Sequence, residues 1–357
     1  FFTITIESNE IVKKSITFMG MLITSFCVFL KFGLFFENGV SSYFTQKILL
    51  DEFSLFGNVL ISLILLFNFL PIWDSSKQLK EKTTEAIILT LMSASGFMLM
   101  VDSENLIMLF IGLEIGSISL YALAGLNRGD KLSNEASLKY FLLGSLASCI
   151  LIYGVSLVYV SFSVFSVYNF ALGIAYVGPD SVPLTTSIGV LLIFIGLLFK
   201  IAAAPFQSWA PDVYQGSPTG YVGFMSSIAK VSSFIVIARL CLVSINFIIE
   251  DFNIFFLIVI ISSALIGSLF ASIQEDLKRL LAYSGVVQSG FILSGIVSGI
   301  NGTSASMFYL FTYILQLIGI FIIFSIINGT LSSEFNIQSI QGLFINNRFL
   351  ATSFCVF

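Results

Sequence analysis

The stretch F-K-I-A-A-A-P-F-Q-S-W-A-P-D-V-Y-Q-G-S-P-T, residues 199–219, decides how this chain folds. It joins two apolar segments and contains Pro205, Pro211 and Pro218. Each proline lacks a backbone N–H donor, so we expect a helix that enters this stretch to break. Broken helices at membrane depth are tolerated where they are buried or line a hydrated cavity, and transporters form ion sites at such breaks. The alternative is an ordinary loop that contains prolines.

Each of the two flanking apolar segments carries one lysine where hydrocarbon is expected. Lys200 lies in the first segment, and Lys230 lies near the middle of the second, which runs over 218–245. A charge at the centre of a membrane helix costs about 2.5–3.5 kcal/mol on insertion scales, so such residues usually mark an ion or proton pathway. Because the chain has no histidine, this pattern favours movement of charge through a membrane over bond chemistry on a substrate.

The composition indicates a membrane protein. The chain is 57% hydrophobic and 10% charged, with a mean hydropathy of +1.01, whereas a soluble domain has about 25% charged residues. The net charge of −4 argues against a nucleic-acid partner. The isolated cysteines Cys27, Cys149, Cys241 and Cys355, together with the lack of histidine, predict no metal, haem or iron–sulfur site. The 39 phenylalanines suggest AT-rich organellar coding.

Apolar windows of about 20 residues predict an all-α polytopic membrane protein with about ten complete transmembrane helices. An eleventh begins near Arg348, and the whole chain, 1–357, forms one transmembrane domain. Short connections such as 102–104 and 300–302 make successive helices antiparallel neighbours. The expected spans are 16–36, 50–71, 84–101, 105–126, 135–161, 187–206, 218–238, 252–272, 280–299 and 303–328.

The basic residues predict the orientation. Ten lie on the side of the N-terminus, side A, and only Lys47 and Arg239 lie on the opposite side, side B. Side A is therefore expected to be the cytoplasmic side, or the matrix side in a mitochondrion. The ten are Lys13, Lys14, Lys77, Lys80, Lys82, Arg128, Lys131, Lys278, Arg279 and Arg348.

Three more ionisable residues lie within expected spans. Glu114, near the middle of the fourth span, invites pairing with Lys200 or Lys230, since a buried charge is costly unless it is paired. The alternative for Glu114, Lys200 and Lys230 is a purely structural contact. Lys139 belongs to the same group or extends to side A, and for Lys31 the better explanation is extension toward side B.

Several motifs then match one family. The segment 199–219 resembles the signature of chain 2 of proton-pumping NADH:quinone oxidoreductase, respiratory complex I, and Val-Tyr-Gln-Gly at 213–216 favours chain 2 over its antiporter-like sister chains. Leu-Glu at 113–114, E-A-S-L-K-Y-F-L-L-G-S at 135–145 and K-R-L-L-A-Y-S at 278–284 are further matches. The resemblance extends from about residue 50 to the C-terminus.

This resemblance implies an antiporter-like bundle of two inverted five-helix repeats, with a broken helix near 200–211. It implies a proton relay of Glu114, Lys200 and Lys230, with Lys139 as a nearby modulator. The chain would bind no NADH or flavin and would hold no redox centre, so it contributes to NADH:ubiquinone reductase only as a proton-translocating subunit. The implied location is the mitochondrial inner membrane, among lipids and the other membrane subunits of complex I, including neighbouring antiporter-like chains.

Three departures from the family pattern matter. Gln288 stands where members often have a histidine, so water or another residue would have to bridge there. The bacterial form has one more N-terminal span, and its loss would put this N-terminus on side A. Residues 341–348 resemble the approach to a second broken helix, whose lysine lies beyond Phe357. We therefore expect an incomplete second repeat and a separate polypeptide, or a continuation, that supplies the remaining helices.

Two other functions compete with this interpretation. One is a subunit of a multisubunit cation/proton antiporter, against which Val-Tyr-Gln-Gly at 213–216 and the lack of an additional intramembrane carboxylate cluster argue. The other is a purely structural membrane subunit, against which the joint presence of Glu114, Lys200 and Lys230 argues. Assembly with an enzyme that oxidises NADH would separate the leading function from the antiporter.

Overall fold

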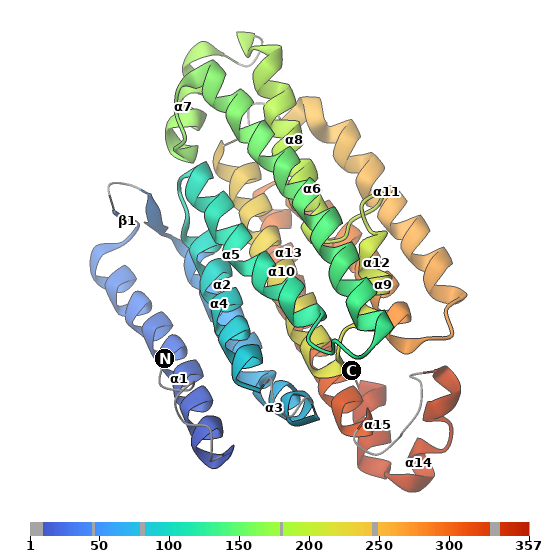
Figure 1. Cartoon of the computed structure of the whole chain (residues 1–357). Coiled ribbons are helices and arrows are strands. Elements are labelled where there is room, and N and C mark those ends of the chain that lie inside the picture. Colours follow the sequence, from blue (N-terminus) through green and yellow to red (C-terminus); the bar gives the residue numbers. More distant parts are fainter. Residues whose placement is uncertain are drawn as a thin grey trace.

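The structure is a computed structural model that describes residues 10–44, 47–78, 83–178, 181–244, 249–328 and 336–356. It is a helical bundle with one small β-hairpin (Figure 1). The α-helices are α1 Glu10–Asn38, α2 Glu52–Phe67, α3 Phe69–Gln78, α4 Thr83–Asp102, α5 Leu106–Ala124, α6 Lys131–Phe162, α7 Val167–Val177, α8 Leu184–Lys200, α9 Trp209–Gly216, α10 Thr219–Arg239, α11 Ile249–Ser272, α12 Leu277–Val297, α13 Ile300–Asn328, α14 Leu343–Asn346 and α15 Arg348–Val356. The remaining elements are strands β1 Ser41–Tyr43 and β2 Ile48–Leu50, the π-helical turn η2 Leu240–Ser244 and the 3₁₀ turn η3 Ile337–Ile340.

The prediction of an all-α membrane protein is confirmed. Within the described ranges, eight helices are long and apolar enough to cross a membrane, and the bent pair α2–α3 makes a ninth. The one expected span that remains, 187–206, corresponds to α8, an apolar helix of 17 residues. Side chains at the connections fix where helices begin: Asn105 accepts the amide of Ile107 at the start of α5, and Asp276 accepts that of Lys278 at the start of α12.

The helix pair α2–α3, which corresponds to the span predicted over 50–71, bends by 44°. Pro71 lies in the first turn of α3 and cannot donate the backbone hydrogen bond that would reach Phe67 four residues earlier. Asn68 lies at the bend, and its side-chain amide donates to the carbonyl of Ile64 at 2.8 Å. Prolines are a principal cause of sharp helix kinks, so Pro71 explains the bend.

The predicted broken helix near 200–211 is confirmed in position, but α8 ends at Lys200 rather than at 206. Residues between α8 and α9 leave the helical path, and two serines bond the released backbone groups. Ser263 of α11 accepts the amide of Ala204 at 2.9 Å, and Ser289 of α12 donates to the carbonyl of Ile201 at 2.8 Å. The break is therefore held inside protein, as is required for irregular backbone at membrane depth.

Helix α10 forms the centre of the bundle, and every residue from Thr219 to Arg239 is buried. It packs against helices from both halves of the chain, including α2, α4 and α13. Beside it, α4 and α5 approach closely because Gly96 and Gly112 carry no side chain: a Cβ on Gly112 would lie 2.5 Å from the amide nitrogen of Met100. This close contact fixes the rotation of α5, which carries Glu114.

Some elements lie outside the ten predicted spans. The hairpin β1–β2 and helix α7 gather at one end of the bundle, where Ser166, just before α7, pairs in an isolated bridge with Asn105 (Figure 1). Helices α14 and α15 lie at the other end, where α3 also ends. Helix α15 begins at Arg348, where the eleventh span was expected. Lys80 and Lys82, which contributed to the predicted orientation, lie outside the described residues.

Candidate functional site

Lys200 is buried at the last position of α8, immediately before the break, with 2% of its surface exposed. Its ammonium donates to the hydroxyls of Ser117 and Tyr121, both at 2.9 Å. It also lies 5.4 Å from the centre of the Tyr121 ring, which is a favourable cation–π distance. The lysine is thus solvated by hydroxyl groups of α5 inside the bundle.

Glu114 lies on the same face of α5 as these hydroxyls, since Ser117 and Tyr121 follow it by three and seven residues. The expected direct pair between Glu114 and Lys200 is not formed. Among the described residues, no carboxylate oxygen lies within 4 Å of the Lys200 ammonium. Ser117 and Tyr121 lie closer to Lys200 and take its hydrogen bonds. Glu114 remains within electrostatic range of Lys200, and its Oε1 is buried without a hydrogen-bond partner.

Lys230 is 3% exposed and lies in the middle of α10. Its ammonium donates to the carbonyl oxygen of Gly285 at 2.8 Å and to the hydroxyl of Tyr313 at 3.2 Å. Its distance from the centre of the Tyr313 ring is 5.3 Å. Both direct contacts are neutral groups, one on α12 and one on α13.

One serine connects the surroundings of the two lysines. The hydroxyl of Ser289 lies 2.8 Å from the carbonyl oxygen of Ile201, which follows Lys200, and 2.8 Å from that of Gly285, which binds Lys230. A hydroxyl carries one proton to donate, so it bonds one carbonyl at a time or shares its proton between them. The broken helix and the Lys230 contact are therefore adjacent in the bundle.

Lys139 does not join Lys200 or Lys230. Its ammonium lies 2.6 Å from the carboxylates of Glu135 and Asp212, and its side chain is 41% exposed. Asp212 also accepts a bond from Arg279 at 2.6 Å. Burial opposes ionisation of Asp212, but the bonds from Lys139 and Arg279 outweigh it and hold the pKa of that carboxyl below its usual value. This charged group connects α6, α9 and α12 where the broken helix meets the side A end.

A second set of ion pairs lies at the side B end. Arg239 is 4% exposed and binds the carboxylate of Asp51 through two nitrogens, at 2.6 and 3.1 Å. It also donates to the carbonyls of Val101 and Ser103 at the end of α4. Lys31, which was expected to extend toward side B, forms an ion pair with Asp102 at the end of α4. These contacts fasten α1, α2 and α10 to the end of α4.

Gln288 was expected to need a bridging partner, and the structure provides Tyr309. The hydroxyl of Tyr309 on α13 donates to the side-chain oxygen of Gln288 on α12. The Gln288 amide therefore bonds a tyrosine hydroxyl on the helix that also carries Tyr313.

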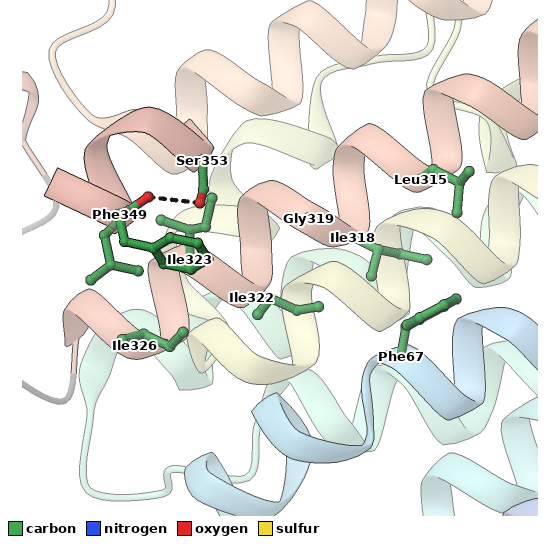
Figure 2. Close-up of a pocket in the computed structure, with 10 residues that line it drawn as sticks. Phe67, Leu315, Ile318, Gly319, Ile322, Ile323, Ile326, Phe349 and Ser353 are labelled. Atoms are coloured by element: carbon green, nitrogen blue, oxygen red, sulfur yellow. Dashed lines mark hydrogen bonds between the residues drawn. The ribbon is translucent and has the colours of Figure 1, made fainter. Parts of the chain in front are cut away.

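An apolar groove of about 460 Å³ lies away from these charges, between α2, α13 and α15 (Figure 2). Its one hydroxyl, that of Ser353, donates to the carbonyl of Phe349 at 2.7 Å. The lining thus offers hydrocarbon and no ionisable group. It consists of Phe67, Leu315, Ile318, Gly319, Ile322, Ile323, Ile326, Phe349, Leu350 and Ser353.

The sequence analysis did not identify several contacts of the site. Helical spacing within L-E-I-G-S-I-S-L-Y could have identified Ser117 and Tyr121, because both share a face with Glu114. Asp212 stands inside the decisive motif, but its partners come from distant helices. Nothing in the sequence around Gly285 or Tyr313 indicates a contact with Lys230, because both are ordinary residues within apolar helices.

Comparison with known proteins provides further findings. Residues 103–357 match the family described as NADH:quinone oxidoreductase/Mrp antiporter, transmembrane. The chain is 35% identical over 320 residues to NADH-quinone oxidoreductase subunit N 1 of Solibacter usitatus, covering 88% of this chain and 64% of the relative. It is 34% identical over 306 residues to NAD(P)H-quinone oxidoreductase subunit 2, chloroplastic, of Mesostigma viride, covering 84% of this chain and 60% of that protein. This chain therefore spans slightly less than two thirds of either relative.

A solved structure shares the fold. A chain of the respiratory complex I from Thermus thermophilus with bound Aureothin superposes with a TM-score of 0.77 and is 28% identical. The match covers 95% of this chain and 70% of that one. The fold described above is thus that of a membrane chain from a respiratory complex I.

Proposed function

Because this chain belongs to the NADH:quinone oxidoreductase/Mrp antiporter transmembrane family, we propose that it is a proton-translocating membrane subunit of respiratory complex I. The observation that supports this proposal is the pair of lysines inside the bundle. Lys200 and Lys230 are almost completely buried, and their direct contacts are hydroxyls and one carbonyl. Ionisable residues at membrane depth are rare unless they serve a pathway.

In this proposal, protons move between Lys200 and Lys230 while electrons move in other subunits. Lys200 at the helix break accepts a proton from one side and passes it toward Lys230. The neutral partners matter, because a carboxylate in direct contact would stabilise the charged lysine and hold the proton in place. A hydroxyl can both donate and accept a hydrogen bond, so it can contact either form of the lysine.

Glu114 and Lys139 have different proposed roles. Glu114 lies within electrostatic range of Lys200 and has a buried oxygen without a partner, so a small movement of either side chain would change how firmly Lys200 holds its proton. Lys139 already forms ion pairs with Glu135 and Asp212. Its proposed role is that of a modulator at the side A end of the broken helix, rather than a member of the central relay.

The wider setting is also proposed. The redox steps belong to other subunits, and this chain, a single transmembrane domain, holds no cofactor. Its partners are the other membrane subunits of complex I, among them neighbouring antiporter-like chains. Lipid hydrocarbon suits the groove beside Phe67 and Phe349 (Figure 2). The membrane is the mitochondrial inner membrane, with side A facing the matrix; this location rests on composition and the distribution of basic residues.

Substitution of Lys230 tests the relay in the intact assembly. We expect Lys230→Met to lower both proton pumping and coupled NADH oxidation in vesicles while the assembly persists. The matched control is Lys131→Met, which removes an exposed lysine at the start of α6. An assembled Lys230→Met variant that pumps normally would rule out the relay. Cation-dependent proton exchange by an assembly that never oxidises NADH would instead support the antiporter function.

A further inference from the structure

The hydroxyl of Ser289 on α12 links the backbone beside Lys200 to the contact of Lys230. Ser289 is 1% exposed, and its oxygen lies 2.8 Å from the carbonyl oxygen of Ile201 and 2.8 Å from that of Gly285. Ile201 directly follows Lys200 in the chain, and the Gly285 carbonyl accepts the ammonium of Lys230 at 2.8 Å. Hydrogen bonds through one hydroxyl therefore join the broken helix to Lys230.

The carbonyl oxygen of Gly285 has no room for a third donor while Lys230 is charged. A carbonyl oxygen has two lone pairs. Helix α12 directs the backbone amide of Ser289, four residues later, to one of them, and the Lys230 ammonium takes the other. The hydroxyl of Ser289 is then available to donate to Ile201.

Loss of the proton from Lys230 changes this competition. A neutral amine is a weaker donor than an ammonium, because hydrogen bonds from charged groups are roughly twice as strong as neutral ones. The neutral amine also gains a lone pair, which can accept the hydroxyl of Tyr313, 3.2 Å away. The carbonyl of Gly285 then becomes the better acceptor for the Ser289 hydroxyl, which leaves Ile201.

The backbone that Ser289 would release is strained. Ala202, the residue after Ile201, has a φ of 56°, in the left-handed region that alanine rarely adopts. Such a conformation persists only where the surrounding structure holds it. One end of this segment is held by Ser263, which accepts the amide of Ala204 at 2.9 Å. The Ser289 hydroxyl holds the other end, next to α8, so its departure lets the strained segment relax.

We propose that Ser289 is a positioning residue that makes the placement of Lys200 depend on the protonation of Lys230, a role that rests on the proposed function above. While Lys230 is charged, the hydroxyl holds Ile201 and keeps Lys200 in place. When Lys230 is neutral, the hydroxyl turns to Gly285, the break relaxes, and Lys200 gives up its proton. The ammonium of Lys200 becomes an amine, and the amine of Lys230 becomes an ammonium. The serine keeps its own proton throughout.

The test uses Ser289→Ala in the intact assembly, in vesicles that oxidise NADH. We expect proton pumping to fall by about three- to tenfold, the rate equivalent of one hydrogen bond. Pumping should fall more than NADH oxidation, because without the link a proton can return from Lys230 to Lys200. A structural defect that lowers the amount of working assembly would reduce both rates by the same factor.

Ser306→Ala is the matched control. Ser306 is a serine of α13 that is 4% exposed, and its hydroxyl donates to the carbonyl of Ile292 on α12 at 2.8 Å. This substitution removes an equivalent bond between two helices, but that bond contacts neither lysine. We expect Ser306→Ala to keep the wild-type ratio of protons pumped to NADH oxidised.

Ala202→Gly tests the strained segment separately. Glycine adopts a positive φ without steric cost, so the break keeps its shape whether or not the Ser289 hydroxyl bonds Ile201. We expect Ala202→Gly alone to slow pumping, because no strain remains to move Lys200. In this background, Ser289→Ala should have little further effect.

The outcomes separate this inference from the proposed function. If Ser289→Ala keeps the wild-type ratio of protons to NADH while Lys230→Met fails to pump, the role of Ser289 is wrong and the lysine relay stands. Fully additive losses from Ser289→Ala and Ala202→Gly would also overturn it. If Lys230→Met pumps normally, the proposed function itself fails. Should Ser289→Ala fail to assemble, Ala202→Gly decides, and wild-type pumping by that variant overturns the inference.

Discussion

Gly285→Ala offers a sharp test of the Lys230 contact, because it adds one methyl group and removes none. A Cβ at this position would lie 2.5 Å from the Lys230 ammonium and 2.9 Å from the Tyr313 hydroxyl. Both atoms are side-chain ends that must move away, and the bond from Lys230 to the Gly285 carbonyl, now 2.8 Å, would lengthen or break. Alanine also favours a helix by up to about 1 kcal/mol over glycine, so a weaker α12 cannot explain a loss of function.

The size of the effect follows from the bond that is lost. A hydrogen bond to a charged group contributes about 1.5–3 kcal/mol, which corresponds to roughly 10- to 100-fold in a rate that depends on it. We expect NADH-driven proton uptake by vesicles that contain the assembly to fall within this range. Gly33→Ala on α1 is the matched control, because nothing lies within 4 Å of the added Cβ.

Two results would refute this reasoning. An assembled Gly285→Ala variant that pumps like the wild type would show that the position of the Lys230 ammonium is unimportant. A Gly285→Ala substitution that lowers pumping equally in the presence and absence of Lys230 would show that it acts elsewhere. If the explanation is right, the effects of Gly285→Ala and Lys230→Met on pumping are not additive, because both disturb the same contact.

Three further predictions concern the surroundings of the site. Glu114→Gln should impair pumping in the assembly much more than Glu37→Gln on the exposed end of α1, and equal effects would remove Glu114 from the relay. The pKa of Asp212 is lowered in the folded chain, so the ionised carboxylate stabilises the fold above its ordinary pKa of about 3.9, and this stabilisation is lost as the pH falls through the pKa of the folded chain. Asp212→Asn should therefore lower the unfolding temperature at pH 7 and make that temperature less sensitive to acid. An unchanged acid response would contradict this. Ser289→Ala leaves the carbonyls it bonds without their hydroxyl and should cost about 1–3 kcal/mol of stability in denaturant unfolding, whereas Ser268→Ala, at an exposed position, should have little effect.

The helices and the break were predictable because their causes are local. Runs of apolar residues predicted the spans, and the three prolines that follow Lys200 predicted the interruption. The end of α8 was placed six residues too late, because residues 201–206 are apolar and hydropathy alone does not distinguish helix from buried irregular backbone. What holds them is tertiary: Ser263 and Ser289 on later helices bond the freed backbone groups.

The partners of the charged residues were less predictable. A buried lysine requires some compensation, and a carboxylate is the usual expectation, which led to the expected pair of Glu114 with Lys200. The structure instead gives Lys200 two hydroxyls from the same helix as Glu114. Sequence spacing identifies which residues share a face of α5, but the distance from that face to the end of α8 depends on packing.

The direct contacts of Lys200 and Lys230 differ in kind from those of the cations at the two ends of the bundle. Lys31 and Arg239 at one end, and Lys139 at the other, bind carboxylates directly. A cation with a carboxylate in contact is held in its charged form, since the pair loses its attraction when the proton leaves. Among the residues that the structure describes, the direct partners of Lys200 and Lys230 are hydroxyl and carbonyl oxygens. Such contacts solvate the ammonium, and the hydroxyls can donate to the neutral amine, so both protonation states keep hydrogen bonds within the bundle.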